Sequence, residues 1–189
     1  MNAARFYRAL AGLALVLSLA SRLPAADTFA SVFISEVGFN GPKDEDGARS
    51  AWIELQNPGT WPVSLGGWFL TDDINHPAAW RLPNVTLLPD KHLLIHATGK
   101  NRTNDLLHLH AGFSLNATGG FVALVTAATN VNSEVNYPKL AGASSFGSVR
   151  GEPGWRGVFP KSTPGKANAS SGPLRAGSFL LPPRRQLRR

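Results

Sequence analysis

The chain has 189 residues, of which 43% are hydrophobic and 16% charged, enough for one domain of ordinary size with a hydrophobic core. It contains no cysteine, which excludes a disulfide framework, a cysteine-based zinc finger and a thiol nucleophile. The net charge of +7 comes from the two ends, because residues 27–174 carry 11 Lys and Arg against 12 Asp and Glu. A nearly neutral body disfavours nucleic acid as a partner, since a nucleic-acid-binding face needs clustered Lys and Arg.

Residues 1–26 have the order of features that is typical of a signal peptide. Arg5 and Arg8 precede an apolar stretch over residues 9–20, and small residues follow at Ala25 and Ala26. The apolar stretch is too short for a typical membrane span. We therefore expect cleavage after Ala25 or Ala26 and no transmembrane segment after cleavage. The mature protein is expected to be periplasmic, on the cell surface or secreted.

From residue 31 onward, short apolar or alternating runs recur about every ten residues, separated by Gly, Pro and Asn. No window there shows a helical period, so the pattern predicts an all-β sandwich or barrel. Five tryptophans are expected to fill a small core: Trp52, Trp61, Trp68, Trp80 and Trp155. The predicted strands cover residues 31–37, 52–56, 63–65, 68–71, 79–82, 92–98, 121–125, 133–137 and 145–149.

Four motifs follow one another in a specific order along these runs. They are Ile-Ser-Glu-Val from Ile34, Trp-Ile-Glu-Leu-Gln-Asn from Trp52, Leu-Gly-Gly-Trp from Leu65 and Thr-Pro-Gly-Lys-Ala-Asn from Thr163. The series resembles the lamin-tail domain (LTD) family in the form found in exported bacterial proteins. The resemblance implies an all-β, immunoglobulin-like β-sandwich over residues 27–168, with no catalytic residues.

What the resemblance implies about function is a non-enzymatic binding or spacer module at the cell surface or outside the cell. Its partner would be a protein or a cell-surface polymer. The DNA contacts of nuclear lamins are not expected here, because of the signal peptide and the nearly neutral body. The Arg-rich residues 169–189 are expected to form a disordered basic tail or a truncated linker. This segment leaves a second hypothesis open: an N-terminal remnant of a larger exported hydrolase or spore-coat-kinase-like protein whose catalytic part is missing.

Two acidic clusters are candidates for a weak Ca²⁺ site, because calcium takes several oxygen ligands from carboxylates. They contain Asp44 and Asp46 in one run and Asp72 and Asp73 in another. The alternative is that these residues lie in solvated turns, for which Asp is favoured. No other cofactor is expected.

Other chemistry finds little support in the sequence. There is no Gly-x-Ser-x-Gly element for a serine nucleophile. His92 and His96 fall in a predicted strand, where they would lie about 13 Å apart, too far to share a metal ion. His108 and His110 would share a strand face and could contact one metal ion, but no third ligand lies at a suitable spacing in the sequence. Glu54 is expected to have a structural role, accepting hydrogen bonds from a neighbouring loop.

Overall fold

The computed structural model describes residues 32–149 and 152–168. The predicted signal peptide, residues 1–26, and the predicted tail, residues 169–189, lie outside the described residues. All the regular elements of the described part are β-strands, which confirms the all-β prediction. Among the described residues, no helix has the length and apolar character needed to cross a membrane.

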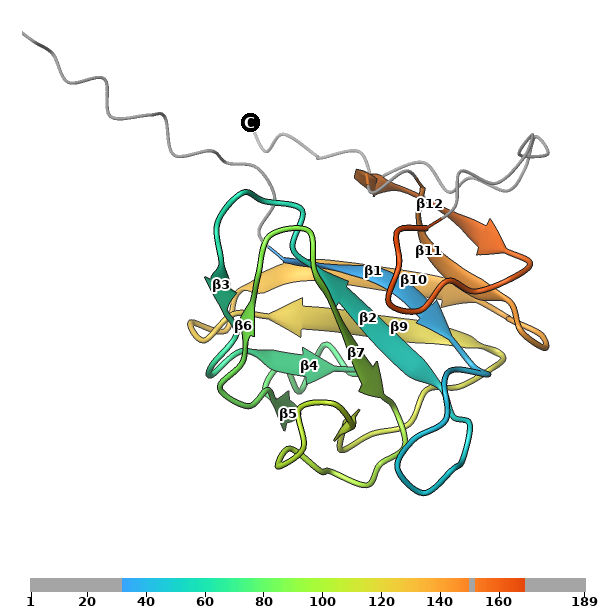
Figure 1. Ribbon diagram of the computed structural model, residues 1–189, viewed down its shortest axis with the longest axis horizontal. Coiled ribbons are helices and arrows are strands. Elements are labelled where there is room, and N and C mark those ends of the chain that lie inside the picture. Colours follow the sequence, from blue (N-terminus) through green and yellow to red (C-terminus); the bar gives the residue numbers. More distant parts are fainter. Residues whose placement is uncertain (1–31, 150–151, 169–189) are drawn as a thin grey trace, which may run out of the picture.

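Two larger sheets and one small ladder make up the fold (Figure 1). The six-stranded sheet has the order β12-β11-β1-β2-β7-β8, with bounds β1 Phe33–Gly38, β2 Trp52–Gln56, β7 His92–His96, β8 Leu109–His110, β11 Ser145–Val149 and β12 Glu152–Phe159. The four-stranded sheet has the order β10-β9-β4-β5, with bounds β4 Phe69–Thr71, β5 Trp80–Arg81, β9 Gly119–Val125 and β10 Val131–Pro138. β3 (Val63–Ser64) pairs with β6 (Thr86–Leu87). Only the pair β7–β8 is parallel among these strands.

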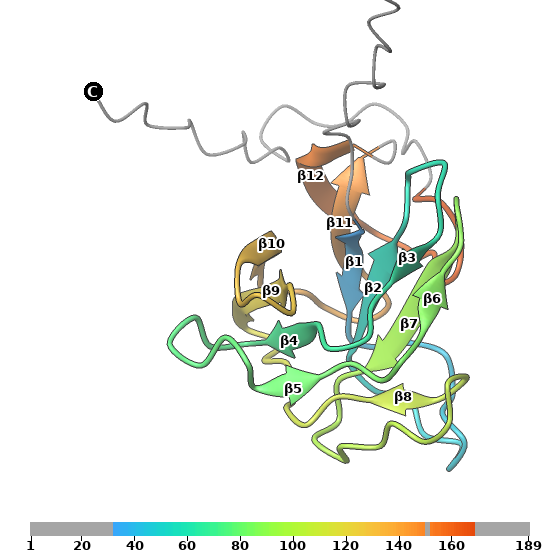
Figure 2. The ribbon, with the colours of Figure 1, turned by 90° about the vertical axis from the view of Figure 1, so that its left-hand side faces the viewer.

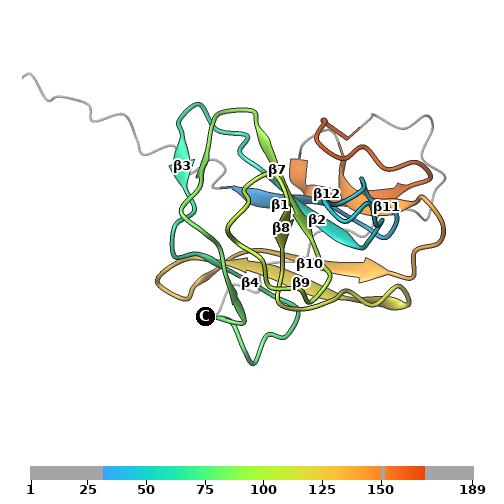
Figure 3. The ribbon, with the colours of Figure 1, turned by 60° about the horizontal axis from the view of Figure 1, so that its bottom comes forward.

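The two larger sheets lie face to face as the layers of a sandwich (Figure 3). Alternation along the strands turns one set of side chains inward, including Ile53 and Leu55 of β2 and Val122 and Leu124 of β9. All four are fully buried in a shared core. Burial of each such side chain contributes about 1.5–3 kcal/mol, so the sandwich rests on this inner layer.

The outward face of β2 is also buried, because two segments cover it. Trp52 is fully buried beneath the loop between β1 and β2, and a Cβ placed on Gly38 would lie only 2.7 Å from Trp52 Nε1. A Cβ on Gly41 would collide with the same ring. Glu54 is fully buried under the chain that follows β12. Hence β2 is covered on both faces although both of its own neighbours, β1 and β7, are antiparallel to it.

The structure corrects the predicted elements at several points. β6, β8 and β12 were not expected: the first two have only two residues each, too few to show a period, and β12 contains Pro153, Gly154 and Gly157, which resemble a loop. The prediction that all five tryptophans fill the core is wrong for two of them. Trp61 is 77% exposed and Trp155 is 49% exposed, whereas Trp52 and Trp80 are buried.

Candidate functional site

An acidic loop joins β1 to β2 at one end of the six-stranded sheet. Its turn is organised by Asp44, whose Oδ1 accepts hydrogen bonds from the backbone N–H of Asp46 at 3.1 Å and of Ala48 at 2.8 Å. Gly47 adopts a φ of 77°, which favours glycine at that position. The Asp-Glu-Asp-Gly run therefore forms a tight turn in which the side chains of Glu45 and Asp46 are partly exposed.

Two cations from the segment after β7 reach this acidic loop. Lys100 Nζ lies 2.7 Å from Asp44 Oδ2 and 2.6 Å from Asp46 Oδ2. Arg102 Nη1 contacts Glu45 and lies 3.1 Å from Asp46 Oδ2. The hydrogen bond from Lys100 holds the pKa of Asp44 at about 2. The charges of the loop are thus largely compensated within the chain itself.

Two buried histidines contact the same loop through Glu45 and Ser50. The rings of His96 and His110 are stacked with centroids 4.9 Å apart. His110 Nε2 lies 2.8 Å from Glu45 Oε2, and its Nδ1 lies 2.8 Å from Thr98 Oγ1. The contact with His110 is the main reason why the pKa of Glu45 is lowered to about 2. Burial lowers the pKa of His96, whose Nδ1 lies 3.1 Å from Ser50 Oγ.

The two acidic clusters that were candidates for a calcium site contact different partners. Asp44 and Asp46 meet at Lys100, whereas Asp73 contacts His76 and Asn75 of its own turn. In the described part of the chain, the side chains close enough to share a metal ion are those of Asp44, Glu45 and His110, whose ligand atoms lie within 4.8 Å of one another. Asp72 and Asp73 are not in this group. The calcium site stays a prediction, and any ion there would compete with Lys100.

Sequence reasoning missed the partners in this cluster. The alternation of Lys100 and Arg102 is a signal for one charged face, but nothing local says that this face meets the loop at residues 44–46. Likewise His96 and His110 become neighbours only through the parallel pairing of β7 with β8, whose register sets His96 opposite His110. His108 turns to Asp105, 2.9 Å away, and so is not a ligand partner of His110.

Residues 160–168, which follow β12, are called the strap. A second polar cluster is buried beneath the strap and binds it by hydrogen bonds. Gly165 N–H in the strap donates to Glu54 Oε2 at 2.5 Å, and Ser35 Oγ donates to Glu54 Oε1 at 2.7 Å. Thr163 N–H donates to Glu36 Oε1 at 3.1 Å. The predicted structural role of Glu54, as an acceptor of hydrogen bonds from a neighbouring loop, is confirmed.

The two strap-binding carboxyl groups are neighbours across the sheet, since Glu36 of β1 is the register partner of Glu54 of β2. Both side chains are fully buried. Burial raises the pKa of Glu54 to about 7, and the nearby charge of Glu36 adds to the effect. Burial also raises the pKa of Glu36. These acids have the shifted pKa values of catalytic groups, but their hydrogen bonds hold the strap, so their role here is structural.

Asn168 completes the attachment of the strap. Its Nδ2 donates to Ser35 O at 3.0 Å and to Ser148 O at 2.8 Å, and its Oδ1 accepts from Thr163 Oγ1 at 3.0 Å. Asn168 thereby joins β1, β11 and the strap. The Thr-Pro-Gly-Lys-Ala-Asn motif is therefore a closing element of the fold.

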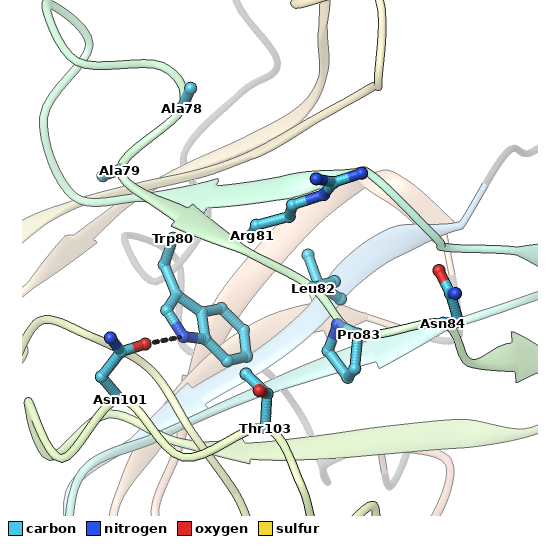
Figure 4. A pocket seen from close by; sticks show the side chains of 9 residues that line it. All are labelled: Ala78, Ala79, Trp80, Arg81, Leu82, Pro83, Asn84, Asn101 and Thr103. Atoms are coloured by element: carbon cyan, nitrogen blue, oxygen red, sulfur yellow. Dashed lines mark hydrogen bonds between the residues drawn. The ribbon is translucent and has the colours of Figure 1, made fainter.

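An open polar cavity of about 640 Å³ lies at the side of the sandwich, next to β5 (Figure 4). Trp80 and Leu82, both nearly buried, belong to its floor, while Arg81 and Asn101 are exposed on its walls. Trp80 Nε1 donates to Asn101 Oδ1 at 3.0 Å and so fixes one wall to the floor. The size is that of an ordinary ligand site. Sequence reasoning missed this cavity, because its walls come from segments about 20 residues apart.

The two larger sheets face each other and Greek-key-like crossovers connect them, which defines an immunoglobulin-like β-sandwich. The family model described as Lamin Tail Domain matches residues 25–139, more than half of the chain. The chain therefore belongs to the lamin-tail domain family, whose fold is non-catalytic. Among curated proteins, none matches this chain. The matched residues run from before β1 to the end of β10, so β11, β12 and the strap follow them.

Proposed function

We propose that this lamin-tail domain is exported and acts as a non-enzymatic binding module in the periplasm, at the cell surface or outside the cell. The partner is a protein or a cell-surface polymer. The observation that carries the proposal is the open polar cavity beside β5, in which the hydrogen bond between Trp80 and Asn101 fixes one wall to the floor. A preformed site of this kind loses little entropy when a partner binds.

The placement of the acidic side chains supports binding rather than catalysis. Glu36 and Glu54 hold the strap, and the carboxylates of the acidic loop contact Lys100 and Arg102. A catalytic carboxyl group needs access to a substrate, and these groups are either buried under the chain or paired with cations. The cavity beside β5 has no acidic side chain in its lining.

Nucleic acid is not the proposed partner. Lys100 and Arg102, the adjacent cations of the end loops, contact three carboxylates of the same chain. Their charge is therefore not available to replace the counterions of a phosphate backbone. Binding that falls steeply with salt and that needs residues 175–189 would contradict this part of the proposal.

The export step is tested by producing the full chain in a bacterial host with a tag at its C-terminus. N-terminal sequencing of the product is expected to find Ala26 or Asp27 as the first residue, in the periplasm or the medium. A cytoplasmic product that still begins at Met1 would contradict export. Sequencing the genomic DNA beyond the stop codon tests the alternative, since a frameshifted catalytic domain there would favour a remnant of a larger protein.

The binding step is tested with the exported product. The labelled chain is mixed with intact cells, with purified cell-wall polymer and with a library of random peptides, and the bound fraction is measured against concentration. Saturable binding to any of the three is expected. Linear, unsaturable uptake by all three would contradict a binding module and leave a spacer.

A further inference from the structure

The strap lies on the outer face of the six-stranded sheet, which is the face that points away from the core. Figure 2 shows the chain after β12, in red, on the side of this sheet that is opposite β4 and β9. Among residues 160–168 only Asn168 is buried, and none belongs to the hydrophobic core. A segment with so few buried contacts opens at a lower free energy than the sandwich needs to unfold.

The middle of the strap is attached through two carboxyl groups. Thr163 donates to Glu36 twice, from its N–H to Oε1 at 3.1 Å and from its Oγ1 to Oε2 at 3.2 Å. Gly165 N–H donates to Glu54 Oε2. The two ends of the strap are held by neutral amide groups, which do not titrate. Only the middle attachment can therefore respond directly to pH.

No cation of the described residues pairs with these two carboxyl groups, although they lie opposite each other on β1 and β2 and are fully buried. β7 contributes His92, whose Nε2 lies 3.9 Å from Glu54 Oε1, but burial lowers the pKa of His92 and so favours its neutral form. β11 contributes no titratable side chain. β12 contributes Arg156, which donates to a backbone carbonyl of β1 at 2.8 Å. The strap itself carries Lys161 and Lys166, both exposed to solvent.

The hydrogen bonds of the pair suit one proton and one negative charge. Glu36 accepts from Ser145 Oγ and from Thr163, as an ionised carboxylate does. A protonated Glu54 can donate from Oε1 to Ser35 Oγ, 2.7 Å away, because the Ser35 proton can turn to Glu54 O at 3.3 Å. Loss of the shared proton places two like charges opposite each other in a buried ladder, which is destabilising.

We propose that the strap is a pH-dependent latch: it covers the outer face of β1 and β2 while Glu36 and Glu54 share one proton, and it detaches when that proton is lost. Water then reaches both carboxylates, which removes the cost of keeping two like charges away from solvent. The core lies on the other face of the sheet, so the sandwich stays folded after release. This inference goes beyond the proposed function and does not depend on the cavity beside β5.

The size of the effect follows from the carboxyl group with the larger known shift. Burial raises the pKa of Glu54 to about 7 under the closed strap, against an ordinary value of 4.5. A pKa that is higher in the closed state favours closure in full below pH 4.5, and this preference is lost as the pH rises through 7. The equilibrium constant for opening should therefore rise roughly 70-fold from pH 5 to pH 8.

The test is hydrogen–deuterium exchange of the full chain at pH 5, 6, 7 and 8, read by mass spectrometry and corrected for the intrinsic exchange rate at each pH. Protection of the strap amides should fall roughly 70-fold from pH 5 to pH 8 and stay below that of the β9 amides, which exchange by global unfolding. Glu54→Gln should remove most of this pH dependence. The matched control Glu134→Gln, at an exposed position on β10, should keep it. Asn168→Ala should lower the protection of the strap at every pH and leave its pH dependence in place, because the amide does not titrate.

Three results would overturn the inference. Equal protection of the strap and β9 amides at every pH would mean that the strap opens only when the sandwich unfolds. Protection of the strap that does not change with pH in the native chain would mean that the pair ionises without release. Full pH dependence in a folded Glu54→Gln would assign the titration to another group. The first two results come from the native chain, so they decide the question even where Glu54→Gln does not fold.

Discussion

Replacement of Glu54 by Gln should remove most of the pH dependence that this residue gives to folding. Burial raises the pKa of Glu54 to about 7 in the folded protein, against an ordinary value of 4.5. A pKa that is higher in the folded state gives stability that is present in full below pH 4.5 and is lost as the pH rises through 7. A difference of roughly two and a half pKa units corresponds to about 3 kcal/mol of unfolding free energy, most of it lost between about pH 4.5 and pH 7.5.

The hydrogen-bonding geometry makes Gln a fair replacement. Its amide oxygen can accept from Gly165 N–H as Glu54 Oε2 does, and its amide N–H₂ can donate to Ser35 Oγ. Ser35 Oγ also lies 3.3 Å from Glu54 O, so its own proton keeps an acceptor. The variant therefore keeps the strap attached while it removes the charge.

The assay is urea denaturation of the full chain at pH 5, 6, 7, 8 and 8.5, with the unfolding free energy extrapolated to water. Other groups titrate in this range, including His92 and His96, whose pKa values are lowered by burial. The quantity of interest is hence the difference between Glu54→Gln and the native chain, in which those contributions cancel. The difference should grow in favour of the variant by about 2.5 kcal/mol from pH 5 to pH 8.5, since part of the loss already occurs below pH 5.

A matched control is Glu134→Gln, which makes the same change at an exposed position on β10. Its difference from the native chain should stay flat over the same pH range. A flat difference for Glu54→Gln as well would refute the reasoning, because it would mean that Glu54 is ionised at little cost under the strap. Glu36→Gln should change in the same direction as Glu54→Gln, since burial raises the pKa of Glu36 too.

Asn168→Ala removes the side-chain amide that donates to two carbonyl groups and should cost about 1–3 kcal/mol of unfolding free energy, with faster proteolysis of the strap as the local readout. Gly41→Ala should cost about 1–3 kcal/mol in the same denaturation assay, because its Cβ collides with the buried ring of Trp52; an unchanged free energy would contradict this packing. Lys100→Met should raise the pKa of Asp44 from about 2 toward its ordinary value, which a carboxyl NMR titration measures. The calcium prediction is checked by the thermal midpoint of the native chain in millimolar Ca²⁺ against EDTA: a rise of several degrees that Asp44→Asn abolishes would support a calcium site, whereas an unchanged midpoint would mean that Lys100 keeps its contacts with Asp44 and Asp46.

Local sequence patterns predicted the strands that carry the core, for a physical reason. β2 begins and ends where the sequence predicts, because Ile53 and Leu55 alternate with their neighbours and burial of one face of a strand requires a period of two. The same reasoning could not find β8, whose two residues are too short for a period and whose pairing is with a distant strand. It also misjudged Trp61, because a large aromatic ring predicts burial only on average.

In the candidate site, too, the sequence predicts the local turn but not the distant residues that contact it. The Asp-Glu-Asp-Gly run predicts a turn, and that turn is formed through the backbone hydrogen bonds of Asp44. The partners of its charges are 54 to 65 residues away in the chain, at Lys100, Arg102 and His110. Sequence alone contains no distance between such segments, so the compensation of these charges could not be predicted.

The sequence by itself determined the all-β class, the family, the strands with a clear period and the turn chemistry of the acidic loop, since each depends on neighbours within a few residues. The tertiary structure alone decided which face of β2 the strap covers, how burial shifts the pKa of Glu54 and where the cavity beside β5 opens. Those properties arise from the docking of segments that are remote in the chain. Burial, electrostatics and cavity shape depend on that docking and have no local signature.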